Sequence, residues 1–175
     1  MGLRHRRDLL RQLPRAGRKP DRRGRQGLRG DHEELQPRRL ALAAAACGYA
    51  QVCFHDTLAW TRERHTFGKR LADHQVVRHQ LVDMATRIEA TRALLDDLAS
   101  RLDDGAAPVA QIAMAKNMAT RTFQFCADRA VQLLGGMGYM RGSRAERLYR
   151  EVKVMMIGGG AEEIMKDLAA RQLGV

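Results

Sequence analysis

A small basic cluster lies beside a predicted loop in the first half of the chain and consists of Arg64, Gly68, Lys69 and Arg70. Cationic groups at this spacing suit a phosphate ligand, although a solvated basic surface has the same composition. Glycine-rich runs follow at 135–138 and 158–160. Glycine lets a backbone approach a ligand closely, but two helix ends would explain the same residues. On residue types alone, a phosphate site and plain loop structure stay open as alternatives.

Metal and thiol chemistry have little support in the residue spacing. The four histidines after residue 40 form no HExxH pattern, and most are expected on polar helix faces: His55, His65, His74 and His79. The three cysteines are odd in number and form no CxxC pair: Cys47, Cys53 and Cys126. That spacing argues against a zinc site and against a disulfide framework. We therefore expect no metal site.

Positive charge is concentrated at the start of the chain. The 175 residues are 45% hydrophobic and 29% charged, with a formal net charge of +11, and this length fits one compact domain. Residues 1–40 hold 13 basic and 5 acidic side chains, interrupted by Pro14, Pro20 and Pro37. We predict a disordered or irregular basic segment over 1–38. It lacks the interleaved aromatic residues and the following module typical of nucleic-acid binding, so we expect no specific nucleic-acid site.

From Leu40 onward the pattern predicts helices and no strands. In 75–102, apolar residues recur at alternating three- and four-residue steps, which indicates a bundle seam. The seam consists of Val77, Leu81, Met84, Ile88, Leu95, Leu98 and Leu102, with Thr91 in the missing slot. Further helices are expected at 40–64, 108–134, 143–156 and 162–173.

Residues typical of helix ends and helix starts complete the predicted fold. Gly135 and Gly136 are a glycine stop, and Ser143 followed by Glu146 is a capping-box pattern. The predicted fold is all-α, an antiparallel up-and-down bundle of long helices over 39–175. No run approaches the roughly 18–20 apolar residues of a membrane helix. The chain shows no secretory signal, so we expect a cytoplasmic protein without a membrane partner.

Several ordered blocks resemble the acyl-CoA dehydrogenase family. Their letters are similar to the family patterns R-x-T-F-G … Q … L-A-D-M and AVQxxGGxGY and to its C-terminal segment. The blocks are 64–69 (RHTFGK), Gln75, 81–84 (LVDM), 130–139 (AVQLLGGMGY), 147–153 and 157–164. The resemblance covers about 39–175, which corresponds to the family's C-terminal helical domain without its N-terminal helical and middle β-domains.

The resemblance implies a flavoenzyme of fatty acid metabolism. In the family, a glutamate removes the α-proton of an acyl-CoA thioester while the β-hydrogen leaves as hydride to the flavin of FAD, giving a 2-enoyl-CoA. An electron-transferring flavoprotein then reoxidises the flavin. The C-terminal domain also makes dimer and tetramer contacts, so the resemblance implies a homo-oligomer.

Individual positions carry these implied roles. The residues that match FAD contacts, largely made from a neighbouring subunit, are Arg64, Thr66, Phe67, Gln75, Gln132 and Gly136. An arginine fork suits a pyrophosphate, and glycines admit backbone N–H groups to it. Arg39 matches the arginine that orders the catalytic centre.

The catalytic base is where this chain departs from the family. The family glutamate lies either in the C-terminal loop, where this chain has Gly159, or on the first helix of the domain, where it has Arg38. Neither residue can remove an α-proton, because glycine has no side chain and arginine stays protonated. Gly159 resembles the branch with its base on the first helix, which makes Arg38 the deciding difference. We therefore expect no intact catalytic residue.

A shifted reading frame is our hypothesis for that difference. Codons exist for 30–37 that read A-I-M-K-N-F-N-P one base later, and 15–29 can be read as V-P-A-E-N-L-I-G-E-G-G-R-G-F-A. Joined, the string resembles the family passage that leads into its glutamate. The gene sequence across Pro37 and Arg38 tests this hypothesis.

Three interpretations of function stay open. The first is an acyl-CoA dehydrogenase relative, present as a fragment that is inactive alone. The second is a non-catalytic helical module that pairs with a complete homologue. The third is a basic-armed nucleic-acid binder, which salt-dependent retention on DNA would support. The sequence does not fix the acyl chain length, nor does it separate dehydrogenase from oxidase chemistry.

Overall fold

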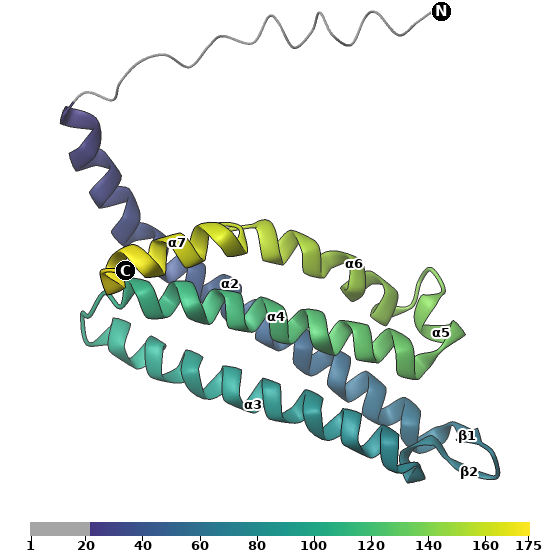
Figure 1. Cartoon of the computed structure of the whole chain (residues 1–175). Coiled ribbons are helices and arrows are strands. Elements are labelled where there is room, and N and C mark those ends of the chain that lie inside the picture. The colour runs from purple at the N-terminus through teal and green to yellow at the C-terminus, as the bar shows by residue number, and fades with distance from the viewer. Residues whose placement is uncertain (1–21) are drawn as a thin grey trace, which may run out of the picture. The chain divides into compact units, whose positions relative to one another are not determined.

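The structure, a computed structural model, describes the backbone of residues 22–175 and the side chains of residues 35–175. The first part of the predicted basic segment, residues 1–21, lies outside the described residues. The chain divides into two compact units, 1–32 and 33–175. The second unit contains every predicted site residue, and within it the all-α fold is confirmed (Figure 1).

The first described helix is longer than its sequence pattern predicted. Helix α2 runs over Arg22–Glu63 and contains Pro37, whereas we expected a start at Leu40. The stretch before Leu40 is rich in Arg, Gln, Leu and Glu, which are good helix formers and need no apolar period to be helical. The prediction of irregular structure is therefore wrong for residues 22–38, while a separate basic segment over 1–38 stays a prediction.

Helix α3 spans Gln75–Asp103 and confirms the predicted seam. Its buried residues are Val77, Leu81, Met84, Ile88, Thr91, Leu95 and Leu98, and Leu102 packs partly buried against the same core. Thr91 fits this apolar seam because its hydroxyl donates to the Arg87 carbonyl at 2.7 Å and lies 2.9 Å from the Thr122 hydroxyl of α4. A hydroxyl with both partners carries little burial cost.

Helix α4, over Val109–Leu134, is the central helix of the bundle. It packs against α3, against α6 (Arg144–Ile157) and against α7 (Glu162–Leu173). Small residues cover several of its faces, including Ala113, Ala119 and Ala127, which are fully buried. A helix that is apolar nearly all round is expected to be enclosed by its neighbours.

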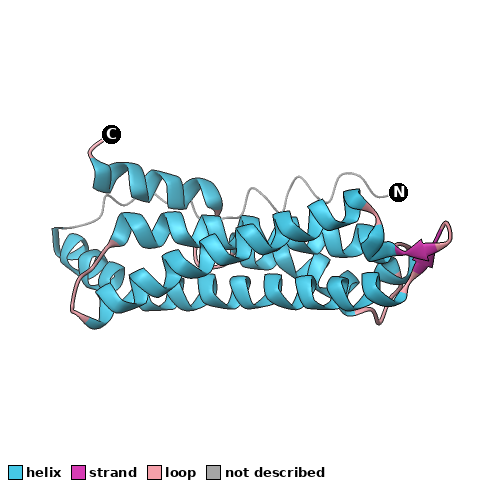
Figure 2. Ribbon diagram, turned by 90° about the horizontal axis from the view of Figure 1, so that it is seen from below, coloured by secondary structure: helices cyan, strands magenta, loops and turns pink. Residues whose placement is uncertain are grey.

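Two short helices together make the last rod of the bundle. Helices α6 and α7 follow one another along α4 and run opposite to it, as Figures 1 and 2 show. The Gly158–Gly160 turn joins them, with positive φ at Gly159 and Gly160. The predicted helix ends are confirmed here, because Ser143 is the N-cap of α6 and Gly158 its C-cap.

Two local expectations are wrong. The capping box does not form: Ser143 makes no side-chain cap hydrogen bond, its backbone N–H donates to the Met140 carbonyl oxygen at 3.0 Å, and Glu146 accepts from Arg150 Nε at 2.5 Å. We also expected no strands, but His65–Thr66 (β1) and Lys69–Arg70 (β2) form a two-stranded hairpin. Two paired residues per strand are too few to show alternating hydrophobicity.

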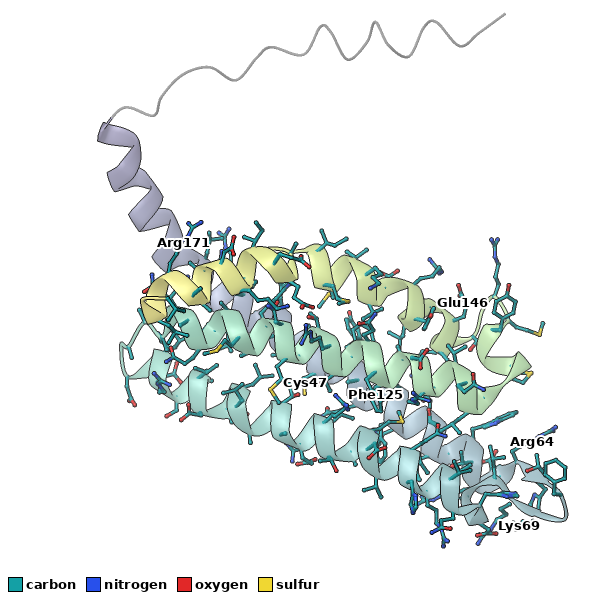
Figure 3. The ribbon with its side chains drawn as sticks, in the orientation of Figure 1. Cys47, Arg64, Lys69, Phe125, Glu146 and Arg171 are labelled. Atoms are coloured by element: carbon teal, nitrogen blue, oxygen red, sulfur yellow. The ribbon has the colours of Figure 1, made fainter. Side chains whose placement is uncertain are left out.

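Cysteine and alanine allow α2 to approach its neighbours closely. Cys47 Sγ lies 3.9 Å from the carbonyl oxygen of Ile88 in α3, and Figure 3 shows it inside the bundle. Burial raises the pKa of Cys53 and of Cys126 to about 12. These thiols are therefore neutral core groups, and all three cysteines are free.

Candidate functional site

The hairpin after α2 presents the first predicted motif. Phe67 has φ 52° and Gly68 has φ 78°, and two successive positive φ values are what a two-residue hairpin turn requires. Thr66 pairs with Lys69 in the antiparallel register. The Thr66 hydroxyl lies 3.3 Å from His74 Nε2, which ties the hairpin to the start of α3.

The glycine-rich run after α4 presents the second motif. Gly135 ends α4 with φ 61°, and the short helix α5 covers Gly136–Tyr139. A Cβ on Gly138 would lie 2.8 Å from the Val131 carbonyl oxygen, so only glycine lets α5 fold back onto the end of α4. At Gly136 a Cβ would meet nothing within 4 Å, so this backbone is open to a ligand.

The two motifs, more than sixty residues apart in sequence, meet at one cleft of about 660 Å³. Three of the predicted residues line it, namely Arg64, Thr66 and Gly136. Its other lining residues are mostly apolar or glycine: Trp60, Leu71, Leu133, Leu134, Gly135, Met137, Tyr139 and Met140. Figure 3 shows Arg64 and Lys69 at this end of the bundle.

The cleft combines a hydrogen-bond donor for a phosphate with aromatic surface for a ring system. Arg64 is exposed, and within the described part of the chain it forms no ion pair. An arginine fork free of carboxylates can take a phosphate oxygen pair. Trp60 and Tyr139 add aromatic surface beside it, so the cleft suits a nucleotide better than a bare ion.

The remaining residues of the predicted cofactor set lie outside this cleft. Phe67 is 98% exposed at the hairpin tip, with its ring centroid 6.4 Å from that of His74 in an edge-to-face arrangement. Gln75, at the start of α3, and Gln132, on the last turn of α4, are also exposed. None of these three side chains lines the cleft of Arg64.

Arg39 lies near the middle of α2 (Arg22–Glu63), beside the second glycine run. Its side chain is 7% exposed, and Nε donates to the Gly159 carbonyl oxygen at 3.3 Å. Arg38, the preceding residue on the same helix, is exposed. The structure therefore brings Arg39 to the loop that holds one of the two expected glutamate positions.

Lys116 of α4 holds the same loop from the opposite side. Its side chain is fully buried, and Nζ donates to the carbonyl oxygens of Met156 at 2.7 Å and Gly160 at 2.6 Å. The neighbouring Asn117 donates from Nδ2 to the Glu162 carbonyl oxygen at 3.0 Å. Burial lowers the pKa of Lys116, and the positive charge of Arg39 lowers it further.

The loop conformation makes Gly159 a poor place for a side chain. Its φ is +70°, which L-residues rarely adopt, and a Cβ would lie 2.6 Å from Leu42 Cδ1. Arg38 carries no such restriction, because it lies on a regular helix with its side chain exposed. Of the two expected positions, only 38 can accept a glutamate without moving the backbone.

Sequence reasoning missed two residues of these sites. Lys116 follows the apolar residues Ala113 and Ala115 and lies three residues before Ala119. A lone lysine in such a stretch is a signal for a buried, hydrogen-bonded ammonium. Trp60, which lines the cleft, is the chain's single tryptophan and lies four residues before Arg64, so one helical turn places both on one face.

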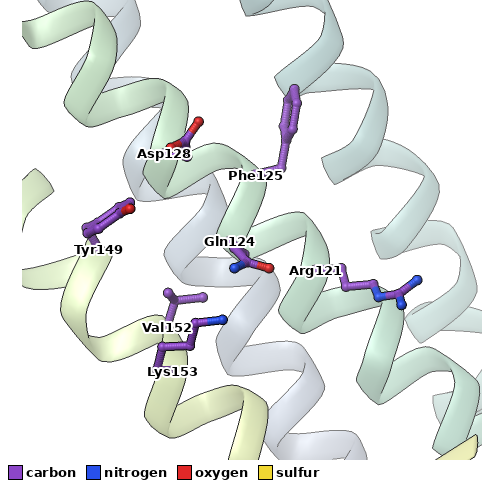
Figure 4. Close-up of a pocket in the computed structure, with 7 residues that line it drawn as sticks. All are labelled: Arg121, Gln124, Phe125, Asp128, Tyr149, Val152 and Lys153. Atoms are coloured by element: carbon purple, nitrogen blue, oxygen red, sulfur yellow. The ribbon is translucent and has the colours of Figure 1, made fainter. Parts of the chain in front are cut away.

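A second hollow contains none of the predicted residues. Figure 4 shows this space of about 360 Å³, where Tyr149 and Lys153 of α6 face residues of α4. Phe125 on its rim lies under two guanidinium groups, with Arg87 Cζ at 4.2 Å and Arg129 Cζ at 5.3 Å from the ring centroid. The ring is therefore already covered by the chain's own cations.

The described residues contain neither a metal-binding cluster nor a helix suited to a membrane. Within 35–175, where side chains are described, no group of three or more His, Cys, Asp or Glu side chains lies close enough to hold a metal ion. None of the helices in this part of the chain combines the length and apolarity needed to cross a membrane.

Comparison with known proteins adds a family to this geometry. A family model described as acyl-CoA dehydrogenase, C-terminal domain, matches residues 25–174. We expected the match to begin at about Arg39, so it begins earlier than predicted. Cyclohexane-1-carbonyl-CoA dehydrogenase of Geobacter metallireducens is 36% identical over 135 residues, which are 77% of this chain and 36% of the relative. The chain thus spans well under half of that relative.

Two further similarities agree with this family. Subunit CarC of the caffeyl-CoA reductase-Etf complex of Acetobacterium woodii is 32% identical over 147 residues, covering 84% of this chain and 39% of the relative. The crystal structure of acyl-CoA dehydrogenase from Geobacillus kaustophilus matches with a TM-score of 0.80 and 38% identity, over 82% of this chain and 38% of that structure. The predicted resemblance is confirmed.

Proposed function

The chain belongs to the acyl-CoA dehydrogenase family, and we propose that it is the C-terminal helical part of an FAD-dependent enzyme that converts an acyl-CoA thioester into a 2-enoyl-CoA. The observation that carries the proposal is the meeting of Arg64, Thr66 and Gly136 at one cleft. These residues come from two motifs that are distant in sequence, and the fold gives them a common ligand surface.

FAD is the proposed cofactor, and the cleft fits its phosphate-bearing part. Arg64 would hold phosphate oxygens, Thr66 would donate its hydroxyl, and the open backbone at Gly136 admits close approach. When bound, FAD supplies the isoalloxazine ring that accepts hydride from the substrate. Phe67, Gln75 and Gln132 are proposed as further contacts, made outside this cleft.

Two subunits are needed for such a cofactor. Arg39 and Arg64 are 25 residues apart along α2, which at the rise of an α-helix is about 37 Å. One extended dinucleotide does not reach across that distance. The Arg64 cleft and the Arg39 loop of one chain therefore serve different cofactor molecules, which supports a homo-oligomer in which each chain contributes to its neighbour's site.

The chain alone is proposed to be inactive. A general base must accept the α-proton, and neither Arg38 nor Gly159 can do so. Arg39 is proposed to order the loop at Gly159, through its hydrogen bond to that carbonyl oxygen. An acyl-CoA dehydrogenase site built on this fold therefore needs a carboxylate at position 38.

The proposed partners follow the family. An acyl-CoA is the substrate, and an electron-transferring flavoprotein is the electron acceptor. One relative is named as a subunit of a caffeyl-CoA reductase-Etf complex, which supports that acceptor. We place the protein in the cytoplasm.

A non-catalytic module is the second candidate function. It is favoured by one observation: both expected positions lack the carboxylate, while the Arg64 cleft is intact. Such a chain could pair with a complete homologue and contribute Arg64 to the homologue's cofactor site. The nucleic-acid alternative depends on the basic residues of 1–38, of which 1–21 lie outside the described residues.

A chimera tests the proposed function. The N-terminal and middle domains of the Geobacillus kaustophilus relative are joined to residues 38–175, and bound flavin is measured by absorbance. We expect the chimera to retain FAD, and Arg64→Gln in the chimera to weaken FAD binding by about 10–100-fold, as the loss of a charge-assisted fork predicts.

Arg62→Gln is the matched control, because Arg62 is an exposed arginine at the end of α2 that does not line the cleft. A folded chimera without flavin, or equal FAD binding by the Arg64 and Arg62 variants, argues against the proposed function. The second candidate predicts that the unfused chain raises the FAD content of a homologue whose own matching arginine has been removed.

A further inference from the structure

The loop between α6 and α7 is held by buried positive charge without a matching carboxylate. Arg39 is 7% exposed and Lys116 is fully buried. Among the described residues, neither forms an ion pair. Glu162, the one acid that acts on Lys116 electrostatically, already pairs with Arg121 and Lys166. Within 35–175 these two buried cations therefore have no acid of their own, which is an unusual state for buried charge.

The two cations differ in how fully they are bonded. Lys116 Nζ donates to two carbonyl oxygens, so two of its three N–H donors have acceptors. Arg39 donates from Nε to the Gly159 carbonyl oxygen, but its Nη1 is buried and has no hydrogen-bond partner in the described part of the chain. A buried guanidinium nitrogen without an acceptor is costly, so Arg39 has one donor that lacks a ligand.

The chain cannot supply that ligand from the loop itself. A side chain at Gly159 meets both a positive φ and the end of the Leu42 side chain. Leu42 is half-buried, and the end of its flexible side chain can move aside for a small molecule more readily than the backbone can. A carboxylate side chain on the loop is therefore excluded, so an acceptor for Arg39 Nη1 comes from outside the loop, and the burial of Nη1 favours a small one.

We propose that Arg39 anchors a binding site for a short carboxylate of one or two carbons, beside the Gly158–Gly160 loop. A planar carboxylate matches the guanidinium fork and neutralises buried positive charge, whereas chloride offers only a single point of contact. The inference goes beyond the proposed function, because carboxylate binding here needs neither flavin nor acyl-CoA.

Formate is the probe that tests the site, with sodium chloride at the same pH and ionic strength as the reference. For the full chain we expect a saturable rise in Tm with formate, about 5–10 °C at a concentration near 100 times Kd. We also expect saturable broadening of the formate carbon signal in NMR. Acetate should act similarly, and pivalate should have no effect because it is too bulky to enter beside Leu42.

Arg39→Gln should abolish both effects, and Arg38→Gln is the matched control. Arg38 is the preceding residue and loses the same charge, but its side chain is exposed, so its variant should respond to formate as the parent chain does. If Arg39→Gln does not fold, Arg39→Lys keeps the charge without the fork and should weaken formate binding at least 10-fold. The absence of a saturable formate effect in the parent chain, or unchanged binding in both Arg39 variants, overturns the proposal.

Discussion

The segment from Arg39 to Arg64, which is the C-terminal part of α2 and the first residue after it, has arginines in opposite environments at its two ends. Arg39 is 7% exposed and bonded to a backbone carbonyl of a distant loop, whereas Arg64 is exposed and lines an open cleft. A buried arginine has one fixed geometry, so a ligand must come to it. An exposed arginine can close on a ligand that is held mainly by another subunit. The chain therefore combines a rigid end, built on buried charge, with an open end suited to binding across an interface.

The rigid end depends most on Lys116. Replacing it by methionine leaves the carbonyl oxygens of Met156 and Gly160 without their donor. We expect Lys116→Met to lower the free energy of unfolding by about 2–5 kcal/mol in urea denaturation. Lys153→Met is the control, because Lys153 is an exposed lysine of α6. It should change the free energy of unfolding by less than about 0.5 kcal/mol. Equal effects of the two variants would show that the loop is not held by Lys116.

The buried thiols make the core sensitive to alkali. Burial raises the pKa of Cys53 and of Cys126 from 9.0 to about 12, so the folded chain keeps protons that the unfolded chain releases. Stability is then full below pH 9 and falls as the pH rises toward 12, with each thiol costing about 1.4 kcal/mol at pH 10.

Urea denaturation at pH 8 and pH 10 measures this loss. Cys53→Ala and Cys126→Ala should each reduce the difference in the free energy of unfolding between pH 8 and pH 10, whatever they do to stability at pH 8. An unchanged pH dependence in the double variant would mean that other groups cause the alkaline loss.

The turn at the rigid end depends on glycine at position 160. Gly160 has φ +117°, and a Cβ there would collide with the end of the Met165 side chain. We expect Gly160→Ala to cost about 1–3 kcal/mol in the free energy of unfolding. Gly158→Ala is the control, since Gly158 has φ −59°, and it should cost less. The reverse order would contradict the turn described for 158–160.

The smallest expected effect is a gain in the helix between the two ends. Gly48 lies inside α2, and a Cβ there would meet nothing within 4 Å. Gly48→Ala should therefore raise the free energy of unfolding by about 0.5–1 kcal/mol, because alanine has the higher helix propensity. A loss of stability in thermal melting would indicate that another chain packs closely at this position.

The sequence predicted the parts of the fold that depend on local periodicity. The α3 seam and the glycine end of α4 follow directly from residue order, as Val77, Leu81 and Gly135 illustrate. The early start of α2 was missed because good helix formers without an apolar period look like a solvated segment. The capping box at Ser143 is absent because both of its groups are otherwise engaged: the Ser143 N–H donates to the Met140 carbonyl oxygen, and Glu146 accepts from Arg150.

The candidate sites were predictable only in part. The family blocks identified Arg64, Thr66 and Gly136, but their meeting at one cleft depends on how α5 folds back at Gly138. The buried clamp at Lys116 depends on contacts 40 and 44 residues away in sequence, which no local pattern contains. Periodicity thus identifies helices and seams, while long-range polar contacts require the structure.

The flavin chimera with and without a base at position 38 tests the central claim most directly. Octanoyl-CoA is added, and bleaching of the flavin absorbance band is followed. We predict that the chimera with Arg38 binds FAD but shows no bleaching, and that Arg38→Glu in the same chimera restores bleaching. Bleaching with Arg38 in place, or a flavin-loaded Arg38→Glu chimera that stays inert, would contradict the account.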